Sequence, residues 1–292
     1  MANAKMVGLI GLGLVGESLA RRLLDAGYAV VGFDVDPVRV RKFESYGGRP
    51  VGTIAEVAKS AERVLIAVFN TAQVAEVIEG AGGLIDSGNR LATCHSTCDP
   101  DQLAALAGRA AARGFALVEA PMSGTSVQIL KGDGVGLIGG ADAAIAQVED
   151  ILQVVCPRRY ALGAAGNGSR AKLAVNLVLG LNRAGLAEGL IFAERLGLDP
   201  VGFLEVLKGS AAYSQVMETK GPKMATRDFA SEGKVAQALK DLHMMLDQAA
   251  SIGQTLPLAT VNASLLEACV AHGEAELDNS IVIEEIRRRR TS

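Results

Sequence analysis

The sequence has no tryptophan, and aromatic residues make up only 4% of its 292 residues, so aliphatic side chains must build most of the core. Its four cysteines are too few for a disulfide framework in a chain of this length. The formal net charge is only −3, which gives no reason to expect nucleic acid or a membrane as a partner. The first apolar run leads into a glycine turn rather than a signal-peptide cleavage site, so the cytoplasm is the expected compartment.

Hydrophobic residues make up 49% of the chain, enough for a large core, and a prior of about 150 residues per domain suggests two domains. The first part alternates short apolar runs with helical stretches, as parallel α/β folds do. The expected strands are Met6–Ile10, Ala29–Phe33, Arg63–Phe69, Arg90–Cys94, Phe115–Glu119 and Gly134–Ile138. The expected helices lie near 16–26, 37–46, 71–79, 99–113 and 142–154.

The pattern changes at a glycine cluster that begins with Gly163. From Ser169 to Leu196 the sequence predicts one long helix, and only helical periodicity follows, near 199–208, 212–226, 233–252 and 257–272. Polar and charged residues interrupt the apolar stretch 173–193, which therefore predicts a buried helix rather than a membrane span. We expect a Rossmann-type α/β dinucleotide-binding domain over 1–162. An all-α domain for substrate binding and dimerisation is expected over 163–292, joined through the long helix.

The stretch that follows the first expected strand has the pattern of a dinucleotide-binding turn. Gly11 permits a tight turn, Gly13 lets a pyrophosphate approach the backbone, and Gly16 allows close packing of helix on strand. The N–H groups at the start of the next helix then face the phosphate charge. The motif predicts cofactor contacts from Gly11, Leu12, Gly13, Leu14, Val15 and Gly16.

An acid at the end of the second expected strand indicates which dinucleotide is bound. Asp34 stands at about the 20-residue spacing at which a carboxylate accepts bonds from the ribose hydroxyls. Asp34 and Asp36 would repel the 2′-phosphate of NADP, so NAD is expected to be preferred at least about tenfold. Arg39 and Arg41 would weaken that inference, but we expect both on the solvated face of the following helix.

Lys172 and Asn176 stand four residues apart, about 40° apart on one helical face. A lysine desolvated in a cleft can have its pKa lowered to about 7–8, which suits a general acid or base. On spacing alone, an ordinary surface lysine beside an asparagine is the favoured interpretation of the pair. Ser123-Gly124, directly after a strand, could bind a substrate carboxylate or could be a plain turn.

Together these motifs resemble the β-hydroxyacid dehydrogenase family, typified by 3-hydroxyisobutyrate dehydrogenase and tartronate semialdehyde reductase. The resemblance spans nearly the whole chain. It rests on the glycine turn, Ser96-Thr97, Ala120-Pro121-Met122-Ser123-Gly124, Gly139-Gly140, Gly166-x-Gly168-x-x-x-Lys172-x-x-x-Asn176 and Lys240-Asp241-Leu242.

The resemblance implies hydride transfer between NAD and a small 3-hydroxy acid or semialdehyde, with Lys172 as the catalytic acid/base and with no metal. Asn176, Ser123, Gly124 and the neighbouring Thr125 would bind the substrate. Further cofactor contacts are expected from Asp34, Phe69, Asn70, Thr97 and Lys240. Similar proteins are dimers or tetramers, so a homodimer or homotetramer is expected.

Several residues depart from the family pattern and cluster around the expected substrate: Thr125, Gln128, Val175 and the pair Cys94-His95. These departures bear on the identity of the substrate more than on the reaction class. Cys94, His95 and Cys98 lack a fourth ligand at sensible spacing for zinc. A semialdehyde or imine reductase and a non-catalytic NAD(H)-sensing protein are the alternatives. Decarboxylating 6-phosphogluconate dehydrogenase is related, but its helical domain is longer.

Overall fold

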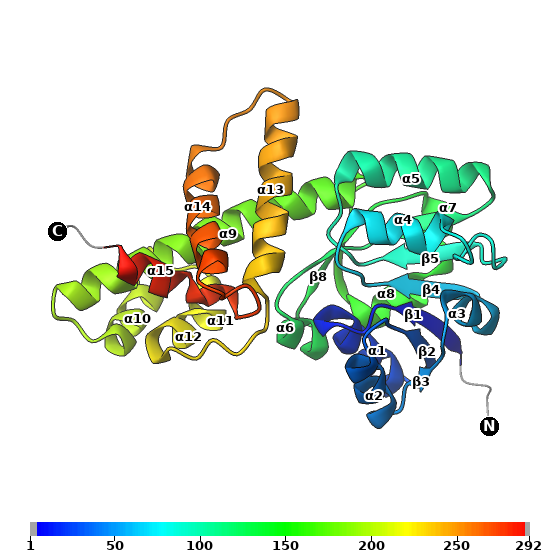
Figure 1. Cartoon of the computed structure of the whole chain (residues 1–292), viewed down its shortest axis with the longest axis horizontal. Coiled ribbons are helices and arrows are strands. Elements are labelled where there is room, and N and C mark those ends of the chain that lie inside the picture. The colour runs from blue at the N-terminus through cyan, green and yellow to red at the C-terminus, as the bar shows by residue number, and fades with distance from the viewer. Residues whose placement is uncertain (1–4, 290–292) are drawn as a thin grey trace. The chain divides into compact units, whose positions relative to one another are not determined.

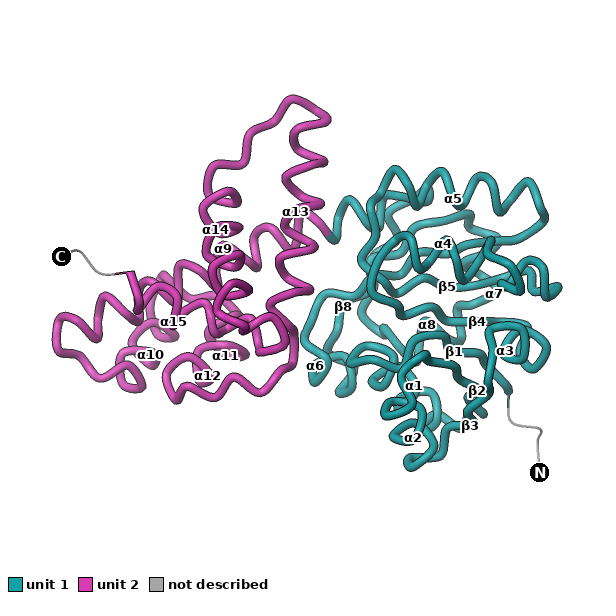
Figure 2. Tube along the Cα trace, viewed as in Figure 1, with its two compact units in different colours: residues 1–172 teal, residues 173–292 magenta. Residues whose placement is uncertain are grey.

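The structure is a computed structural model that describes residues 5–289. The chain forms two compact units, which meet in sequence between Lys172 and Leu173 (Figure 2). This division falls inside the long helix α9 (Asn167–Arg195), whereas the boundary expected from the sequence lies just ahead of that helix.

Unit 1 is built on a six-stranded sheet in the order β3-β2-β1-β4-β5-β6, with every neighbouring pair parallel (Figure 1). Its strands are β1 (Met6–Ile10), β2 (Ala29–Phe33), β3 (Arg49–Pro50), β4 (Arg63–Ile66), β5 (Leu91–Cys94) and β6 (Ala116–Glu119). This order is that of the doubly wound dinucleotide-binding fold, with its switch point between β1 and β4. The expected fold class is confirmed.

Helices connect these parallel strands: α1 (Leu14–Asp25), α2 (Pro37–Ser45), α3 (Ile54–Ser60), α4 (Thr71–Glu79) and α5 (Pro100–Ala112). Side-chain caps fix several of their starts, because an oxygen accepts from the otherwise unpaired N–H groups of the first turn. Asp36 begins α2 in this way, Asn70 begins α4 and Asp99 begins α5. The α3 helix was not predicted, although Thr53 and Glu56 form a capping box at its start.

A second, three-stranded sheet completes unit 1. It contains β7 (Met122–Ser123), β8 (Val135–Ile138) and β9 (Arg158–Ala161), with β8 antiparallel to β7 and parallel to β9. The helices α6 (Ser126–Lys131), α7 (Asp142–Gln147) and α8 (Glu149–Val155) belong to this part. The single helix expected near 142–154 is therefore two short ones, and β7, β9 and α6 were not predicted.

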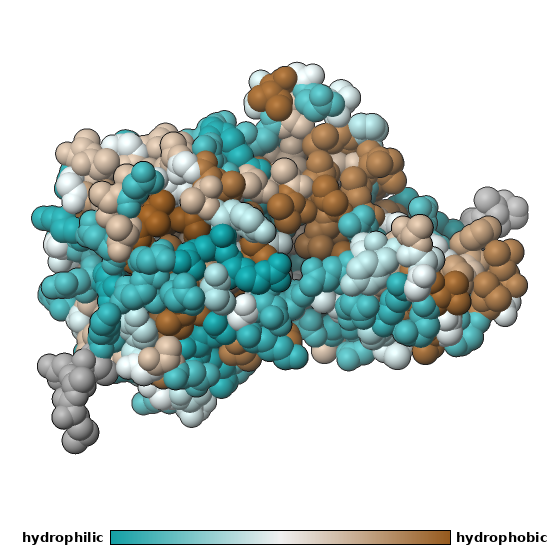
Figure 3. All heavy atoms as spheres, turned by 180° about the vertical axis from the view of Figure 1, so that it is seen from behind, coloured by the Kyte–Doolittle hydropathy of each residue, from teal (hydrophilic) through white to brown (hydrophobic). Residues whose placement is uncertain are grey.

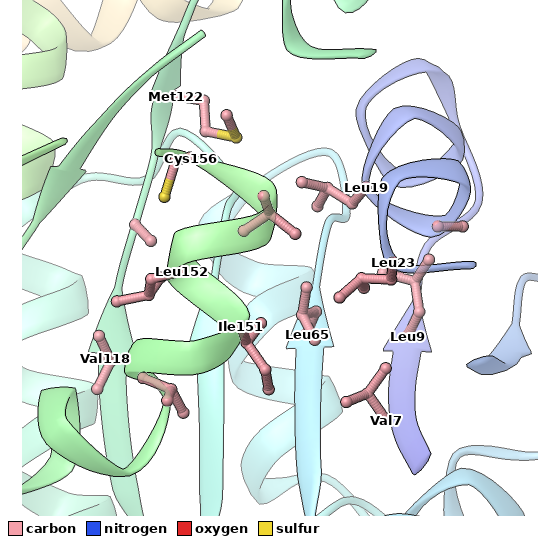
Figure 4. Close-up of a cluster of buried hydrophobic side chains, with 14 of the residues drawn as sticks. Val7, Leu9, Leu19, Leu23, Leu65, Val118, Met122, Ile151, Leu152 and Cys156 are labelled. Atoms are coloured by element: carbon pink, nitrogen blue, oxygen red, sulfur yellow. The ribbon is translucent and has the colours of Figure 1, made fainter. Parts of the chain in front are cut away.

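Hydrophobic clusters cover both faces of the large sheet, because successive strand residues point to opposite sides. Val7 and Leu9 of β1 pack in the cluster with α1 and α8, where Leu19 and Ile151 are labelled in Figure 4. Ile10 belongs to the opposite cluster, with residues of α3, α4 and α5. This burial fixes the carboxyl ends of the strands, where the glycine turn and the following loops lie.

Unit 2 is helical, as expected. Besides most of α9 it contains α10 (Pro200–Lys208), α11 (Val216–Thr219), α12 (Gly221–Thr226), α13 (Val235–Ser251), α14 (Pro257–Ala271), the 3-10 turn η1 (Asn279–Ile281) and α15 (Val282–Arg288). Its core includes Leu190, Leu242 and Leu266, all buried. The segment expected as one helix near 212–226 is divided into α11 and α12, and α15 was not predicted.

The long helix α9 is, by length and composition alone, apolar enough to cross a membrane, a test that core helices of other proteins also pass. Only 33% of its most apolar 18-residue window is buried. The prediction of a buried helix is therefore wrong for one face, on which Val178 and Phe192 are 59% and 67% exposed. Unit 2 covers the opposite face, where Leu186 and Leu190 are buried.

Candidate active site

The glycine turn between β1 and α1 has the geometry that its three glycines suggest. Gly11 has a φ of +93°, a conformation that side chains other than glycine rarely adopt. A Cβ on Gly16 would lie 2.0 Å from the carbonyl oxygen of Gly11, so the helix approaches the turn too closely for any side chain there. A Cβ on Gly13 would meet only the guanidinium of Arg39, at 3.7 Å, which leaves room for a ligand at this position.

Asp34 lies beside this turn with its side chain buried. Its carboxylate accepts hydrogen bonds from the backbone N–H of Leu12, at 2.7 Å, and of Asp36, at 2.8 Å. Nη1 of Arg39 lies 3.5 Å from Oδ2 of Asp34, and its Nε lies 3.3 Å from Oδ2 of Asp36. Arg39 is exposed, as expected, but its guanidinium also lies against the two carboxylates beside the glycine turn, which the sequence did not predict.

The loops that follow β4 and β5 are joined by Ser96. Its hydroxyl donates to the carbonyl of Val68 and accepts from the N–H of the same residue. This holds Thr97 next to the segment that contains Phe69 and Asn70. The Asn70 side chain caps α4, whereas Phe69 is exposed. These candidate cofactor contacts thus lie on two tied loops at one edge of the sheet.

The Ser-Gly turn joins β7 to α6. Ser123 is the last residue of β7, and Gly124 has a φ of +141°. Thr125 caps α6, since its hydroxyl accepts from the N–H of Gln128 while the Gln128 side chain accepts from the N–H of Thr125. These two departures from the family pattern therefore form a capping box.

Lys172 brings two of the predicted motifs together within unit 1. The residue is only 7% exposed, and its Nζ donates a hydrogen bond of 2.6 Å to the carbonyl oxygen of Met122. Met122 directly precedes Ser123 in β7. The amine is thus held beside the Ser-Gly turn and out of bulk water.

Glu119 at the end of β6 was not predicted to have a role, yet it fixes the start of α9. Its buried carboxylate accepts from the N–H of Gly168, at 2.7 Å, and from the N–H and the hydroxyl of Ser169, at 3.1 and 2.8 Å. A carboxylate is favourable here, because the first N–H groups of a helix lack partners and carry partial positive charge. Lys172 follows Ser169 by less than one turn of the same helix.

Close packing around Glu119 explains why glycines occupy positions 139 and 168 of the motifs. A Cβ on Gly139 would lie 2.1 Å from the Glu119 carboxylate, and one on Gly168 would lie 2.4 Å from the carbonyl oxygen of Leu137. Gly139 also pairs with Glu119 in an antiparallel bridge. The sequence signal for this arrangement is an acid at the end of one strand, Glu119, followed by a glycine just after a later strand, Gly139, and a glycine at the start of a helix, Gly168.

Asn176 of α9, in unit 2, is a further candidate site residue. The Asn176 amide donates to Asp241 at 3.0 Å, and the Asp241 carboxylate also lies 2.9 Å from Nζ of Lys240. Because a carboxylate only accepts, the NH2 group of Asn176 must face it and the amide oxygen must point away. That oxygen is buried and has no hydrogen-bond partner among residues 5–289. It is suited to accept from a hydroxyl group.

His95 is buried, and both of its ring nitrogens have partners, Thr93 and the carbonyl of Ala120. Burial lowers the pKa of His95 to about 4. The Sγ atoms of Cys94 and Cys98 lie 3.9 Å apart in the same interior. Within the part of the chain that the structure describes, no three His, Cys, Asp or Glu side chains are grouped to hold a metal ion.

The doubly wound sheet, the glycine turn at its switch point and the acid at the end of β2 define a dinucleotide-binding protein. Comparison with known families gives the same class. Residues 6–163 match the family described as the NAD-binding domain of 6-phosphogluconate dehydrogenase. Residues 166–286 match the family described as NAD-binding of NADP-dependent 3-hydroxyisobutyrate dehydrogenase.

Similar proteins match along the whole chain. An L-threonate dehydrogenase of Cupriavidus necator is 31% identical over 96% of both chains. A 2-hydroxy-3-oxopropionate reductase of Escherichia coli is 28% identical, also over 96% of both. A crystal structure of 3-hydroxyisobutyrate dehydrogenase from Salmonella typhimurium superposes with a TM-score of 0.88 at 26% identity, covering 96% of this chain and 99% of that one. The chain belongs to the β-hydroxyacid dehydrogenase family of oxidoreductases, which confirms the resemblance seen in the sequence.

Proposed function

We propose that this protein transfers a hydride between NAD and a small 3-hydroxy acid, with Lys172 as the general acid/base. One observation carries the proposal: the buried Lys172 amine is fixed by the carbonyl that directly precedes the Ser123-Gly124 turn. A proton carrier and a carboxylate-binding turn thus lie side by side. The names of the relatives, which act on hydroxy acids or an oxo acid, are consistent with it.

Lys172 supplies the proton step. During reduction its ammonium donates to the carbonyl oxygen of the substrate, and during oxidation its amine accepts the hydroxyl proton. Ser123 and Gly124, with Thr125 at the start of α6, receive the substrate carboxylate. Asn176, one turn later on the same helix, also binds the substrate. Because the single hydroxyl proton goes to Lys172, the unpartnered Asn176 oxygen accepts from a second donor of the substrate.

The nicotinamide ring of the bound cofactor supplies or takes the hydride. The residues present fit such a cofactor, because Gly13 leaves its backbone open and the α1 N-terminus can receive the pyrophosphate. We propose that Asp34, the loops around Phe69 and Thr97, and Lys240 complete the cofactor contacts.

NAD is the proposed cofactor, since Asp34 and Asp36 both lie at the end of β2 and a single arginine, Arg39, is paired with them. The site therefore keeps one excess negative charge, which disfavours a 2′-phosphate. Values of kcat/KM for the two cofactors should differ at least about tenfold in favour of NAD. A preference for NADP would show instead that Arg39 moves away from Asp34 and Asp36 and binds the 2′-phosphate.

A second copy of the chain is the proposed macromolecular partner, as a homodimer or homotetramer. Figure 3 shows hydrophobic surface over the helices of unit 2, where Val178 and Phe192 of α9 and Val261 of α14 are more than half exposed. Such a face is typical of an interface. Light scattering should give a mass of at least two chains, and Phe192→Glu should lower it.

The direct test of the activity is a panel of hydroxy acids. Wild-type protein with NAD should form NADH with at least one of 3-hydroxyisobutyrate, glycerate, threonate and 4-hydroxybutyrate, followed by absorbance. NADH binding is measured separately by fluorescence. Binding of NADH with no turnover of any panel member would favour the sensing protein, and turnover of cyclic imines alone would favour the imine reductase.

A further inference from the structure

Arg183 of α9 is a buried cation for which the fold provides no acceptor. It is 7% exposed, its Nε is buried, and it makes no hydrogen bond or ion pair with any residue among 5–289. Burial lowers the pKa of Arg183 to about 10, so the guanidinium still carries its charge at neutral pH. An isolated buried charge is costly, and proteins retain one mainly where something else pairs with it.

Burial lowers the pKa of Arg183, and the charge of Asp278 raises it in part, but the hydrogen-bonding positions of Asp278 are already used by other groups. Both oxygens of Asp278 accept from Lys220, at 2.9 and 2.8 Å, and its carboxylate also accepts from the N–H groups of Glu232, Gly233 and Ser280. Asp278 therefore neutralises Lys220. Arg183 remains as a net positive charge in the interior of the helical unit.

A second buried polar group faces the same point. Asn262 of α14 is 4% exposed and likewise makes no hydrogen bond among the described residues. A Cβ on Gly180 would lie 3.2 Å from Nδ2 of Asn262 and 3.8 Å from Nη2 of Arg183. The amide and the guanidinium thus both lie beside Gly180, where a side chain would crowd the amide, and both present N–H donors.

This pair of donors is aligned with Asn176. Arg183 follows Asn176 by two turns of α9, which places both on one helical face with an axial separation of about 10 Å. Helical side chains lean toward the N-terminus, and the Arg183 guanidinium reaches the level of Gly180. Because Asn176 leans the same way, the two polar groups stay within about 10 Å of each other along the axis. All four residues, including Asn262, belong to unit 2.

We propose that Arg183 and Asn262 bind the distal carboxylate of a dicarboxylic 3-hydroxy acid whose reacting end lies beside Asn176. This inference rests on the function proposed above and names its substrate class. Arginine binds a carboxylate through two parallel N–H···O bonds, and the Asn262 amide adds a third donor. A monocarboxylic substrate would leave the cation without an anion.

The test compares two substrates that differ only at the distal end. These are 2-(hydroxymethyl)pentanedioate and 2-(hydroxymethyl)pentanoate, in which a methyl group replaces the second carboxylate. Wild-type protein should oxidise the diacid with a kcat/KM at least about tenfold higher, as loss of a charged hydrogen bond implies. Arg183→Met should lower kcat/KM for the diacid by at least about tenfold and leave the monoacid within about twofold. Arg195→Met, an exposed arginine of the same helix, is the matched control and should change neither value.

A thermal-unfolding readout separates recognition from a structural role. Because Arg183 has no protein partner, Arg183→Met should unfold at the same or a higher temperature than wild type. Pentanedioate, which lacks the hydroxyl group, should raise the unfolding temperature of wild type more than pentanoate does, and this difference should vanish in the variant.

Each remaining outcome has a defined meaning. Turnover of neither substrate, together with failure of the hydroxy-acid panel, contradicts the proposed function, whereas the pentanedioate shift still reports on the anion site. Equal kcat/KM for both substrates, unchanged by Arg183→Met, overturns the distal subsite while the dehydrogenase activity stands. Loss of folding in Arg183→Met would show that the arginine supports the core, and it too overturns the proposal.

Discussion

Replacing Glu119 by glutamine tests how the proposed catalytic lysine is positioned. The carboxylate accepts three hydrogen bonds, one on Oε1 from Gly168 and two on Oε2 from Ser169. In the variant an NH2 group must replace one oxygen, and it then faces a backbone N–H whichever way the amide turns. At least one first-turn donor of α9 therefore loses its acceptor in a buried site.

The magnitude follows from these contacts. Loss of a hydrogen bond to a charged group costs about 1.5–3 kcal/mol, and removal of a negative charge from a helix N-terminus costs up to about 2 kcal/mol. Because the neutral amide is also easier to bury, we expect Glu119→Gln to lower the free energy of unfolding by roughly 2–4 kcal/mol. Fraying of the first turn should displace Lys172, so kcat should fall while the affinity for NADH is retained.

Urea unfolding measures the first effect, and steady-state kinetics with fluorescence titration of NADH measures the second. Glu44→Gln is the control, because Glu44 is exposed on α2. Glu44→Gln should change the free energy of unfolding by no more than about 0.5 kcal/mol. If Glu119→Gln unfolded at the urea concentration of wild type, the carboxylate would not be holding α9 and the reasoning would be refuted.

Two further predictions follow from packing and burial. Gly139→Ala places a Cβ 2.1 Å from the Glu119 carboxylate and should lower the free energy of unfolding in urea by about 1–3 kcal/mol. The control Gly108→Ala, in α5 with no atom within 4 Å of the new Cβ, should raise it by up to about 1 kcal/mol. Equal effects of the two substitutions would contradict the close packing at Gly139. Burial lowers the pKa of His95 to about 4, so as the pH falls the unfolded chain binds a proton at this residue before the folded chain does. The contribution of neutral His95 to the free energy of unfolding is complete above about pH 6.5 and should fall by up to roughly 3 kcal/mol as the pH drops toward 4. Titration of the His95 ring near pH 6.5 in an NMR experiment would contradict this.

The parts of the fold that could be predicted are those with strong local periodicity. The bounds of β1, β2 and α4 agree with the expected ranges, because each combines an apolar pattern with a glycine or capping residue. By contrast, β9 has the sequence RRYA and is largely exposed, so it carries no apolar signal. The α15 helix buries Glu284 and Glu285. Arg289 pairs locally with Glu285, but Arg227, which pairs with Glu284, is brought near only by the tertiary structure.

The candidate site divides in the same way. The steric reasons for Gly11 and Gly16 follow from local geometry and are visible in the turn. The meeting of Lys172 with the β7 turn depends on residues 50 positions apart, which spacing could not reveal and only the family resemblance implied. The role of Glu119 and the pairing of Arg39 with Asp34 and Asp36 were missed, because both depend on partners that are brought together by folding.

The central claim is that the Lys172 amine carries the proton, and the most direct test measures kcat and NADH affinity in Lys172→Met. Lys131→Met, an exposed lysine of α6, is the control. The account predicts a fall in kcat of about a hundredfold to ten-thousandfold, with the Kd for NADH and the unfolding temperature close to those of wild type. Turnover by Lys172→Met at a rate near that of the control would contradict it.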